Sequence, residues 1–158
     1  MSKKKYNLNT IYISERLQEN LKPISQSAFT AVTAPMGYGK TTAINWYLDK
    51  QSKNGNSCVI RISIYSDNQT VFWQSVQKAF AFAGLDFLDN YSCPSDAASA
   101  GMLADELCYS LSGQTSYYIF IDDFHLLTDA RIGDFFCTLA KRIPDNIHII
   151  VASRDRFL

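Results

Sequence analysis

The stretch Ala34-Pro-Met-Gly-Tyr-Gly-Lys-Thr-Thr42 decides the fold of this chain, because Ala34 to Thr41 fits the phosphate-binding loop pattern (Ala/Gly)-x-x-x-x-Gly-Lys-(Ser/Thr). The apolar, β-rich run at 28–33 predicts a buried strand before the loop, and Thr41 to Lys50 predicts a helix after it. A phosphate-binding loop needs this strand–loop–helix context. The stretch therefore predicts a site for a nucleoside triphosphate.

The residue types in this loop suit phosphate binding. Glycines let the backbone approach phosphate oxygens, so that amide N–H groups at the helix N-terminus point at the ligand. Lys40 would place a cation at the β- and γ-phosphates, the Thr41 hydroxyl would ligate Mg²⁺, and Thr42 would contact the α-phosphate. The alternative is a glycine-containing turn that binds nothing. The predicted nucleotide-binding residues are Pro35, Gly37, Tyr38, Gly39, Lys40, Thr41 and Thr42.

The composition indicates one ordinary globular domain. The chain has 158 residues, 47% of them apolar, which is enough for a sizeable core. Lys+Arg (15) balance Asp+Glu (15), and the one dense basic run, Lys3-Lys4-Lys5, lies at the N-terminus, so composition gives no argument for nucleic-acid binding. No apolar stretch approaches the ~20 residues of a membrane span, and no secretory signal is present. We expect a cytoplasmic protein without membrane contact.

Short apolar strands alternate with helices along the chain, which predicts an α/β fold with a parallel sheet. In such a sheet the ligand lies at the carboxyl ends of the strands, where the residues after the first, third and fourth strands should converge. A short amphipathic helix is also expected from Thr10 to Leu21. The strands are predicted at 28–33, 58–64, 117–122 and 147–152, and the main helices at 40–52, 69–84, 96–112 and 130–142.

Two groups of side chains are expected in the core. Phe72, Trp73, Phe80 and Phe82 follow a helical pattern that would cover one face of the sheet, although Trp73 could instead belong to a partner surface. The cysteines show no C-x-x-C pair, which predicts free and mostly buried thiols rather than a zinc site or disulfides. They are Cys58, Cys93, Cys108 and Cys137.

A second motif, Tyr117-Tyr-Ile-Phe-Ile-Asp-Asp123, is a hydrophobic strand that ends in two carboxylates. Asp122 is predicted to help hold Mg²⁺ through its water shell, and Asp123 to orient or activate the attacking water. Side chains alternate between the faces of a strand, so the two acids suit separate roles. The alternative is a strand end with two solvated acids, which the phosphate loop upstream makes less favourable.

The last predicted strand runs directly into Ser153 and Arg154. A guanidinium at the carboxyl end of this strand could sense or stabilise the γ-phosphate. The alternative is a surface arginine near the chain end. Together with Lys40, Asp122 and Asp123, Arg154 completes the set of predicted catalytic residues.

Three blocks together resemble the ATPase domain of the large ATP-dependent LuxR-family transcriptional regulators. They are the phosphate loop, Ile121-Asp-Asp-Phe-His-Leu-Leu127 and Ile150-Val-Ala-Ser-Arg154, and the similarity extends to Ser63-Ile-Tyr-Ser-Asp-Asn68 followed by Phe72-Trp73. The resemblance implies a P-loop NTPase of the class of signal-transduction ATPases with numerous domains (STAND). It implies a three-layer αβα sandwich with strand order 1-4-3-2, truncated after the sensor strand.

The resemblance also implies how such a chain works. Domains of this class bind ATP or ADP with Mg²⁺, switch conformation, self-associate and hydrolyse ATP slowly. We expect a flexible tail at 1–10 and an ATPase core at 11–158, with the lid, superhelical and DNA-binding domains absent, so that DNA would be bound only through those domains. An unpaired sheet edge beside the first strand would favour self-association.

Three functions remain open from the sequence. The first is a weak ATPase that serves as the switch domain of a cytoplasmic regulator. The second is a P-loop enzyme such as a motor or a phosphotransferase, although no acceptor-substrate motif or arginine finger is recognisable. The third is a nucleotide-binding interaction module without turnover, in which Asp123 replaces the longer glutamate that is commoner at this position.

Overall fold

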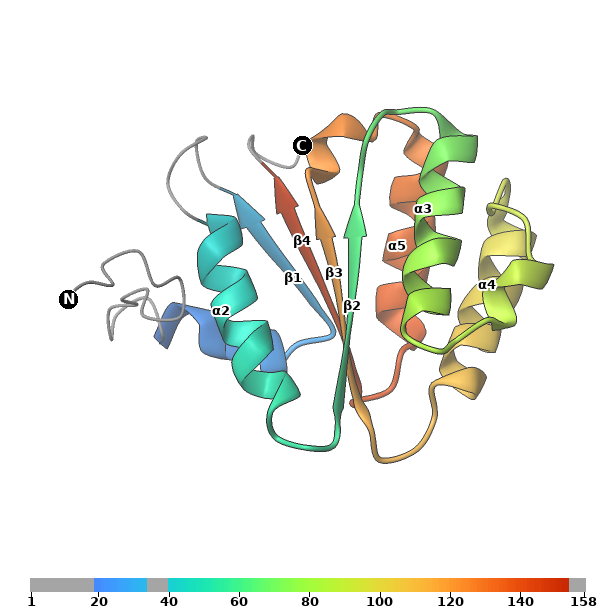
Figure 1. The fold of residues 1–158 in the computed structure, drawn as a ribbon. Coiled ribbons are helices and arrows are strands. Elements are labelled where there is room, and N and C mark those ends of the chain that lie inside the picture. The colour runs from blue at the N-terminus through green and yellow to red at the C-terminus, as the bar shows by residue number, and fades with distance from the viewer. Residues whose placement is uncertain (1–18, 34–39, 154–158) are drawn as a thin grey trace.

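A four-stranded parallel sheet lies between helices on both of its faces (Figure 1). The structure, a computed structural model, describes residues 19–33 and 40–153. The strands are β1 (Phe29–Thr33), β2 (Ser57–Ser63), β3 (Ser116–Asp122) and β4 (Ile147–Ser153). The α-helices are α2 (Lys40–Ser52), α3 (Gln69–Phe82), α4 (Ala97–Ser110) and α5 (Ala130–Arg142), and the short 3₁₀ helices are η2 (Lys22–Ser25), η3 (Phe87–Asn90) and η4 (Phe124–Leu126).

The strand order is β1-β4-β3-β2, which confirms the predicted order 1-4-3-2. Each observed strand matches its prediction to within one residue at either end. The register pairs Thr33 with Ser153 and Ser63 with Asp122, so the strands end at one common edge of the sheet. In the part of the chain that the structure describes, β1 and β2 are the edge strands.

Two hydrophobic cores lie on opposite faces of the sheet, which gives the three predicted layers. On β3, Ile119 and Ile121 face the larger core beneath α3, α4 and α5, whereas Tyr118 and Phe120 face the smaller core beneath α2. Figure 1 shows α2 and the short helical segment before β1 on one side of the sheet, and α3, α4 and α5 together on the opposite side. Strand β4 is buried along its whole length because both of its faces are covered.

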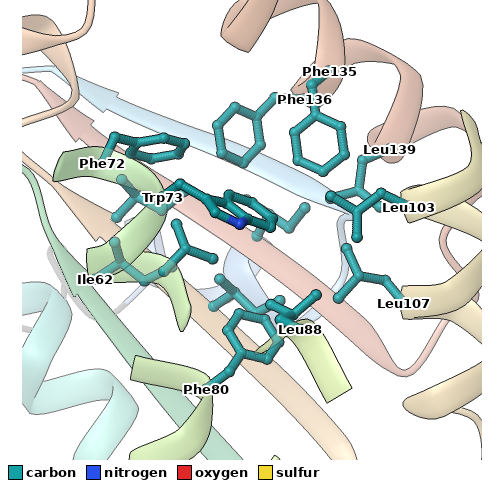
Figure 2. A pocket seen from close by; sticks show the side chains of 14 residues that line it. Ile62, Phe72, Trp73, Phe80, Leu88, Leu103, Leu107, Phe135, Phe136 and Leu139 are labelled. Atoms are coloured by element: carbon teal, nitrogen blue, oxygen red, sulfur yellow. The ribbon is translucent and has the colours of Figure 1, made fainter. Parts of the chain in front are cut away.

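The larger core contains a small cavity that Figure 2 shows from close by. Its volume is about 30 Å³, and fourteen side chains from the sheet, α3, η3, α4 and α5 line it, among them Trp73 and Phe136. The indole N–H of Trp73 donates a hydrogen bond of 2.7 Å to the Tyr91 carbonyl, so no polar group is left to hold a water there. The cavity is a packing void rather than a binding site.

Local signals in the sequence fix the ends of the helices. The Asn68 side chain accepts a hydrogen bond of 3.0 Å from the Val71 N–H and caps α3. Gly84, with φ +86°, closes the same helix, and the Leu85 N–H donates back to the Phe80 carbonyl at 2.8 Å. Asp96 opens α4 with a capping box, in which the side chains of Asp96 and Ser99 each accept from the backbone N–H of the other.

Two predictions about the core are wrong, and the predicted N-terminal helix lies mostly outside the described residues. Phe82 is 96% exposed, because it follows Phe80 by two residues and points about 200° away from it around the helix. The cysteine side chains are half-buried or, for Cys137, exposed, rather than mostly buried. Of the helix expected from Thr10 to Leu21, the structure describes only residues 19–21, and these are helical.

Truncation of a core residue tests the packing of α4 against the larger core. Leu103→Ala is expected to lower the free energy of unfolding by about 2–5 kcal/mol, because it enlarges the apolar cavity that Leu103 lines. The neighbouring Met102 is 67% exposed, so Met102→Ala should change stability by no more than about 0.5 kcal/mol. Urea unfolding of both variants measures the difference; equal losses would contradict the described packing.

The α4 cap predicts a dependence of stability on pH. Hydrogen bonds from the Ser99 backbone N–H and then from the Ser99 side chain hold the pKa of Asp96 below its ordinary value of 3.8. A lowered pKa stabilises the folded state above pH 3.8, and this contribution is lost as the pH falls through the folded pKa. Asn also caps helices but does not titrate. Between about pH 7 and pH 3, the urea midpoint of the wild type should therefore fall more than that of Asp96→Asn.

Candidate nucleotide-binding site

The carboxyl edge of the sheet brings together the two motifs that the sequence singles out. Helix α2 begins at Lys40, directly after the phosphate-loop residues, and β3 ends at Asp122. Asp122 lies on the same face of β3 as Tyr118 and Phe120, because side chains alternate along a strand. That face is the one covered by α2, so the carboxylate points toward the first turn of this helix.

Thr41 and Asp122 are in direct contact across this edge. The Thr41 Oγ1 lies 3.2 Å from Asp122 Oδ2 and 3.4 Å from Oδ1, and the hydroxyl donates to the carboxylate. The two residues are 81 positions apart in the chain, and both are half-buried. The structure therefore places the predicted magnesium ligands side by side.

Asp123 leaves the strand in a left-handed conformation with φ 59° and ψ 38°. It is the one non-glycine residue with positive φ among the described residues. Its backbone N–H donates a hydrogen bond of 2.9 Å to Asp122 Oδ1, which helps to orient that carboxylate. Its own side chain is exposed at the edge of the sheet. The strand thus ends at Asp122, and the left-handed backbone of Asp123 turns the second acid away from the strand direction.

Contacts between neighbouring loops hold this edge in place. Phe124, which follows Asp123, packs edge-on against Phe136 of α5, with ring centroids 5.6 Å apart. The Thr128 hydroxyl donates to an Asp67 carboxylate oxygen at 3.3 Å and so connects the loop after β3 to the loop after β2. The turn that carries Asp123 is therefore anchored to the larger core.

Helix α2 is fixed to the sheet by its buried face and by one ionic contact that the sequence reasoning missed. Ile44 and Leu48 are fully buried in the smaller core. Arg61 of β2 donates to Asn45 Oδ1 and to Asp49 Oδ1, both at 2.9 Å, and thereby binds the exposed side of α2 to the sheet edge. No local pattern predicts this contact, because it joins residues from different elements.

The remaining predicted site residues are placed only in part. Thr42 is exposed in the first turn of α2, and Lys40 opens that helix. Pro35, Gly37, Tyr38, Gly39 and Arg154 lie outside the described residues.

The contacting atoms of Thr41 and Asp122 suit a magnesium ion. A hydroxyl oxygen and a carboxylate oxygen are hard donors, which Mg²⁺ prefers. Asp122 Oδ2 lies 3.2 Å from Thr41 Oγ1, so a carboxylate stands beside the hydroxyl that would ligate the ion, where it could accept hydrogen bonds from the water shell of the ion. The donor set and its spacing therefore fit the metal that a phosphate-binding loop implies.

Comparison with known proteins decides the family. Residues 22–154 match the family described as AAA domain. The chain belongs to this family. The matched range contains the four strands, helices α2 to α5 and both residues of the Thr41–Asp122 contact.

The chain is also similar to curated proteins that are transcriptional regulators. The chain is 25% identical over 157 residues to the HTH-type transcriptional regulator MalT of Vibrio campbellii, and 26% identical over 155 residues to MalT of Yersinia pestis (strain Pestoides F). These alignments cover 93% and 92% of this chain but only 16% of each relative. The predicted similarity to the ATPase domain of LuxR-family regulators is confirmed, and the chain spans about one sixth of the length of these relatives.

Solved structures share the fold at low sequence identity. Cdc6p from Pyrobaculum aerophilum superposes with a TM-score of 0.58 at 12% identity, over 96% of this chain and 43% of that chain. The ORC2 protein of Aeropyrum pernix superposes with a TM-score of 0.55 at 14% identity, over 94% of this chain and 44% of that chain.

Within the described residues, no helix combines the length and the hydrophobicity that a membrane span requires.

Substitution of Asp123 tests the unusual backbone at this edge. Asp123→Val is expected to lower the free energy of unfolding by about 1–2 kcal/mol, because a β-branched side chain is disfavoured at φ 59°. Asp123→Gly should leave stability nearly unchanged, since glycine adopts this conformation without steric cost. Thermal or urea unfolding of the two variants measures the contrast. Equal stability of the valine and glycine variants would show that the turn is extended rather than left-handed.

Proposed function

We propose that this chain is a Mg-ATP-binding switch domain of a cytoplasmic LuxR-type transcriptional regulator and that it hydrolyses ATP slowly. The observation that carries the proposal is the contact of 3.2 Å between the Thr41 hydroxyl and the Asp122 carboxylate. It joins the end of the phosphate-loop motif to the acid at the end of β3. These are the two parts of a P-loop site that hold the metal of a bound nucleotide.

Each predicted residue then has a role in this site. The loop from Pro35 to Lys40 would cradle the phosphates, and Thr41 and Asp122 would hold Mg²⁺, which neutralises charge on the β- and γ-phosphates. Asp123 would orient the attacking water from its exposed position after the strand. Arg154 would sense the γ-phosphate from the end of β4.

The comparisons support the nucleotide and the regulatory role without naming a signal. The ORC2 protein that shares this fold is described in ADPNP and ADP complexes, which supports ATP or ADP as the ligand here. The MalT relatives are transcriptional regulators, and this chain aligns with about one sixth of their length. We therefore assign DNA binding to other parts of such a protein, and self-association to its ATPase domain.

Three variants separate the proposed switch from its alternatives. Lys40→Ala should weaken ATP binding by about 10–100-fold, because it removes charge-assisted contacts to phosphate. Asp122→Ala should weaken binding chiefly in the presence of Mg²⁺. Asp123→Ala should preserve binding but lower phosphate release by about 100-fold, as expected when a general base is lost. Calorimetry with ATP, with and without Mg²⁺, and a phosphate-release assay measure the two properties.

The control is Asp145→Ala, an exposed acid in the loop that precedes β4, at the opposite end of the sheet. It should change neither binding nor turnover. ATP binding that is unaffected by Lys40→Ala would refute the proposed site. Binding without any turnover in the wild type would instead favour a nucleotide-binding interaction module, and rapid turnover with an acceptor molecule would favour a phosphotransferase.

A further inference from the structure

A surface groove of about 530 Å³ lies along the outer edge of β2 and extends to Ser63, the residue that pairs with Asp122 on the neighbouring strand. One wall is the end of this edge strand, and the other is the flank of α3. In the part of the chain that the structure describes, no strand pairs with β2 on this side. The lining residues are Arg61, Ser63, Tyr65, Val71, Gln74, Ser75, Lys78, Ala79 and Phe82.

The hydrogen bonds to β3 show which backbone groups of β2 point into this groove. The Asn56 carbonyl accepts from the Ser116 N–H at 3.0 Å, and the Ile64 N–H donates to the Asp122 carbonyl at 3.4 Å. In a parallel ladder, every second residue turns both backbone groups to the same neighbour. The even-numbered residues of β2 therefore face β3, and the odd-numbered ones face outward. Arg61 and Ser63, the two β2 residues that line the groove, belong to the outward set.

The walls of the groove expose apolar side chains that contact little of the protein. Phe82 is 96% exposed and Tyr65 is 74% exposed, and Val71 lies on the same flank of α3. Ser75 and Ala79 between them are small and leave room for another chain. An open strand edge offers main-chain hydrogen bonds to an added β-strand, and the apolar side chains beside it can contact alternate side chains of that strand.

The charge of the groove narrows the choice of occupant. Its lining includes two basic residues, Arg61 and Lys78, and no acidic residue. Arg61 also pairs with Asp49 of α2, but its side chain remains 44% exposed and has N–H groups beyond the two that contact Asn45 and Asp49. A second copy of this chain is disfavoured, because antiparallel pairing of two β2 edges would set Arg61 opposite or diagonal to its counterpart. An extended segment with acidic side chains matches the charge, and apolar side chains match the wall formed by α3.

We propose that this groove binds an extended segment of a partner protein by β-strand addition, in which acidic residues alternate with apolar ones. Side chains of β2 at positions 59 and 61 lie on the face covered by α2, whereas Ile60 and Ile62 lie on the face covered by α3. The acidic residues of the added strand would therefore lie beside Arg61, and the apolar residues beside Phe82 and Val71. This inference is independent of nucleotide binding.

The probe is a fluorescein-labelled heptapeptide of alternating valine and glutamate with both ends blocked, titrated with the full chain. We expect saturable binding by fluorescence anisotropy. A peptide of alternating valine and lysine should bind at least about tenfold more weakly, because its lysines would lie beside Arg61 with like charge. A peptide of the same composition with the valines and glutamates in separate blocks should be similarly weak, because it cannot sort its side chains onto two faces.

Two variants test the edge and the wall separately. Ser63→Pro replaces an outward-facing N–H at the end of an edge strand, a position where proline is tolerated, and should weaken peptide binding about tenfold. Phe82→Ser should weaken it by a similar factor through lost apolar contact. The matched control is Tyr109→Ser, which removes an aromatic group that is 80% exposed on α4 and should leave binding unchanged. Circular dichroism confirms that each variant is folded.

Loss of binding in Ser63→Pro and Phe82→Ser but not in Tyr109→Ser supports the groove as a strand acceptor. Absence of peptide binding by the wild type, or equal binding by all three variants, overturns the proposal. A concentration-dependent dimer in sedimentation velocity that both groove variants abolish, without peptide binding, also overturns it and assigns the groove to a second copy of the chain.

Discussion

The alternation of side chains along β3 is the constraint on which this structure depends. Tyr118 and Phe120 fill the core beneath α2, while Ile119 and Ile121 fill the core beneath the other three helices. Because both faces are buried, a shift of the strand by one residue would exchange the two sets and lose both cores. The same alternation directs the next residue, Asp122, toward α2. The position of the predicted metal ligand is thus determined by the packing of the sheet.

Local patterns in the sequence predict the elements well, because each one carries its own signal. The strands are short apolar runs, and Asn68, Gly84 and Asp96 mark helix ends through hydrogen bonds or backbone conformations that only nearby residues make. The order of the strands is different, since periodicity does not specify which strands pair. That order came from the resemblance to a family. The prediction that Phe82 packs with Phe80 is wrong, because residues two positions apart point about 200° away from each other around a helix.

In the candidate site too, residues that belong to a local motif are predictable from the sequence, whereas contacts between distant elements are not. Thr41 and Asp122 were identified by motif, since a phosphate-binding loop and a strand ending in acids carry recognisable residue types. The left-handed turn at Asp123 was not predicted, because an aspartate followed by Phe124 carries no specific turn signal; the turn is supported by packing of Phe124 on Phe136. The Arg61 contact with Asn45 and Asp49 was also missed, since it exists only once α2 lies beside β2.

The alternation of side chains along β2 limits which segments can pair with its open edge, just as the alternation along β3 determines where Asp122 points. On β2, the residues whose backbone groups face outward are also those whose side chains lie on the α2 side, as the contact of Arg61 with Asp49 shows. An added strand that uses these groups must pair in a register in which its own side chains continue the two faces. A slip by one residue would place its acidic groups against Phe82 and its apolar groups beside Arg61. Alternation in the partner segment, rather than its net charge alone, is therefore what the edge of β2 selects.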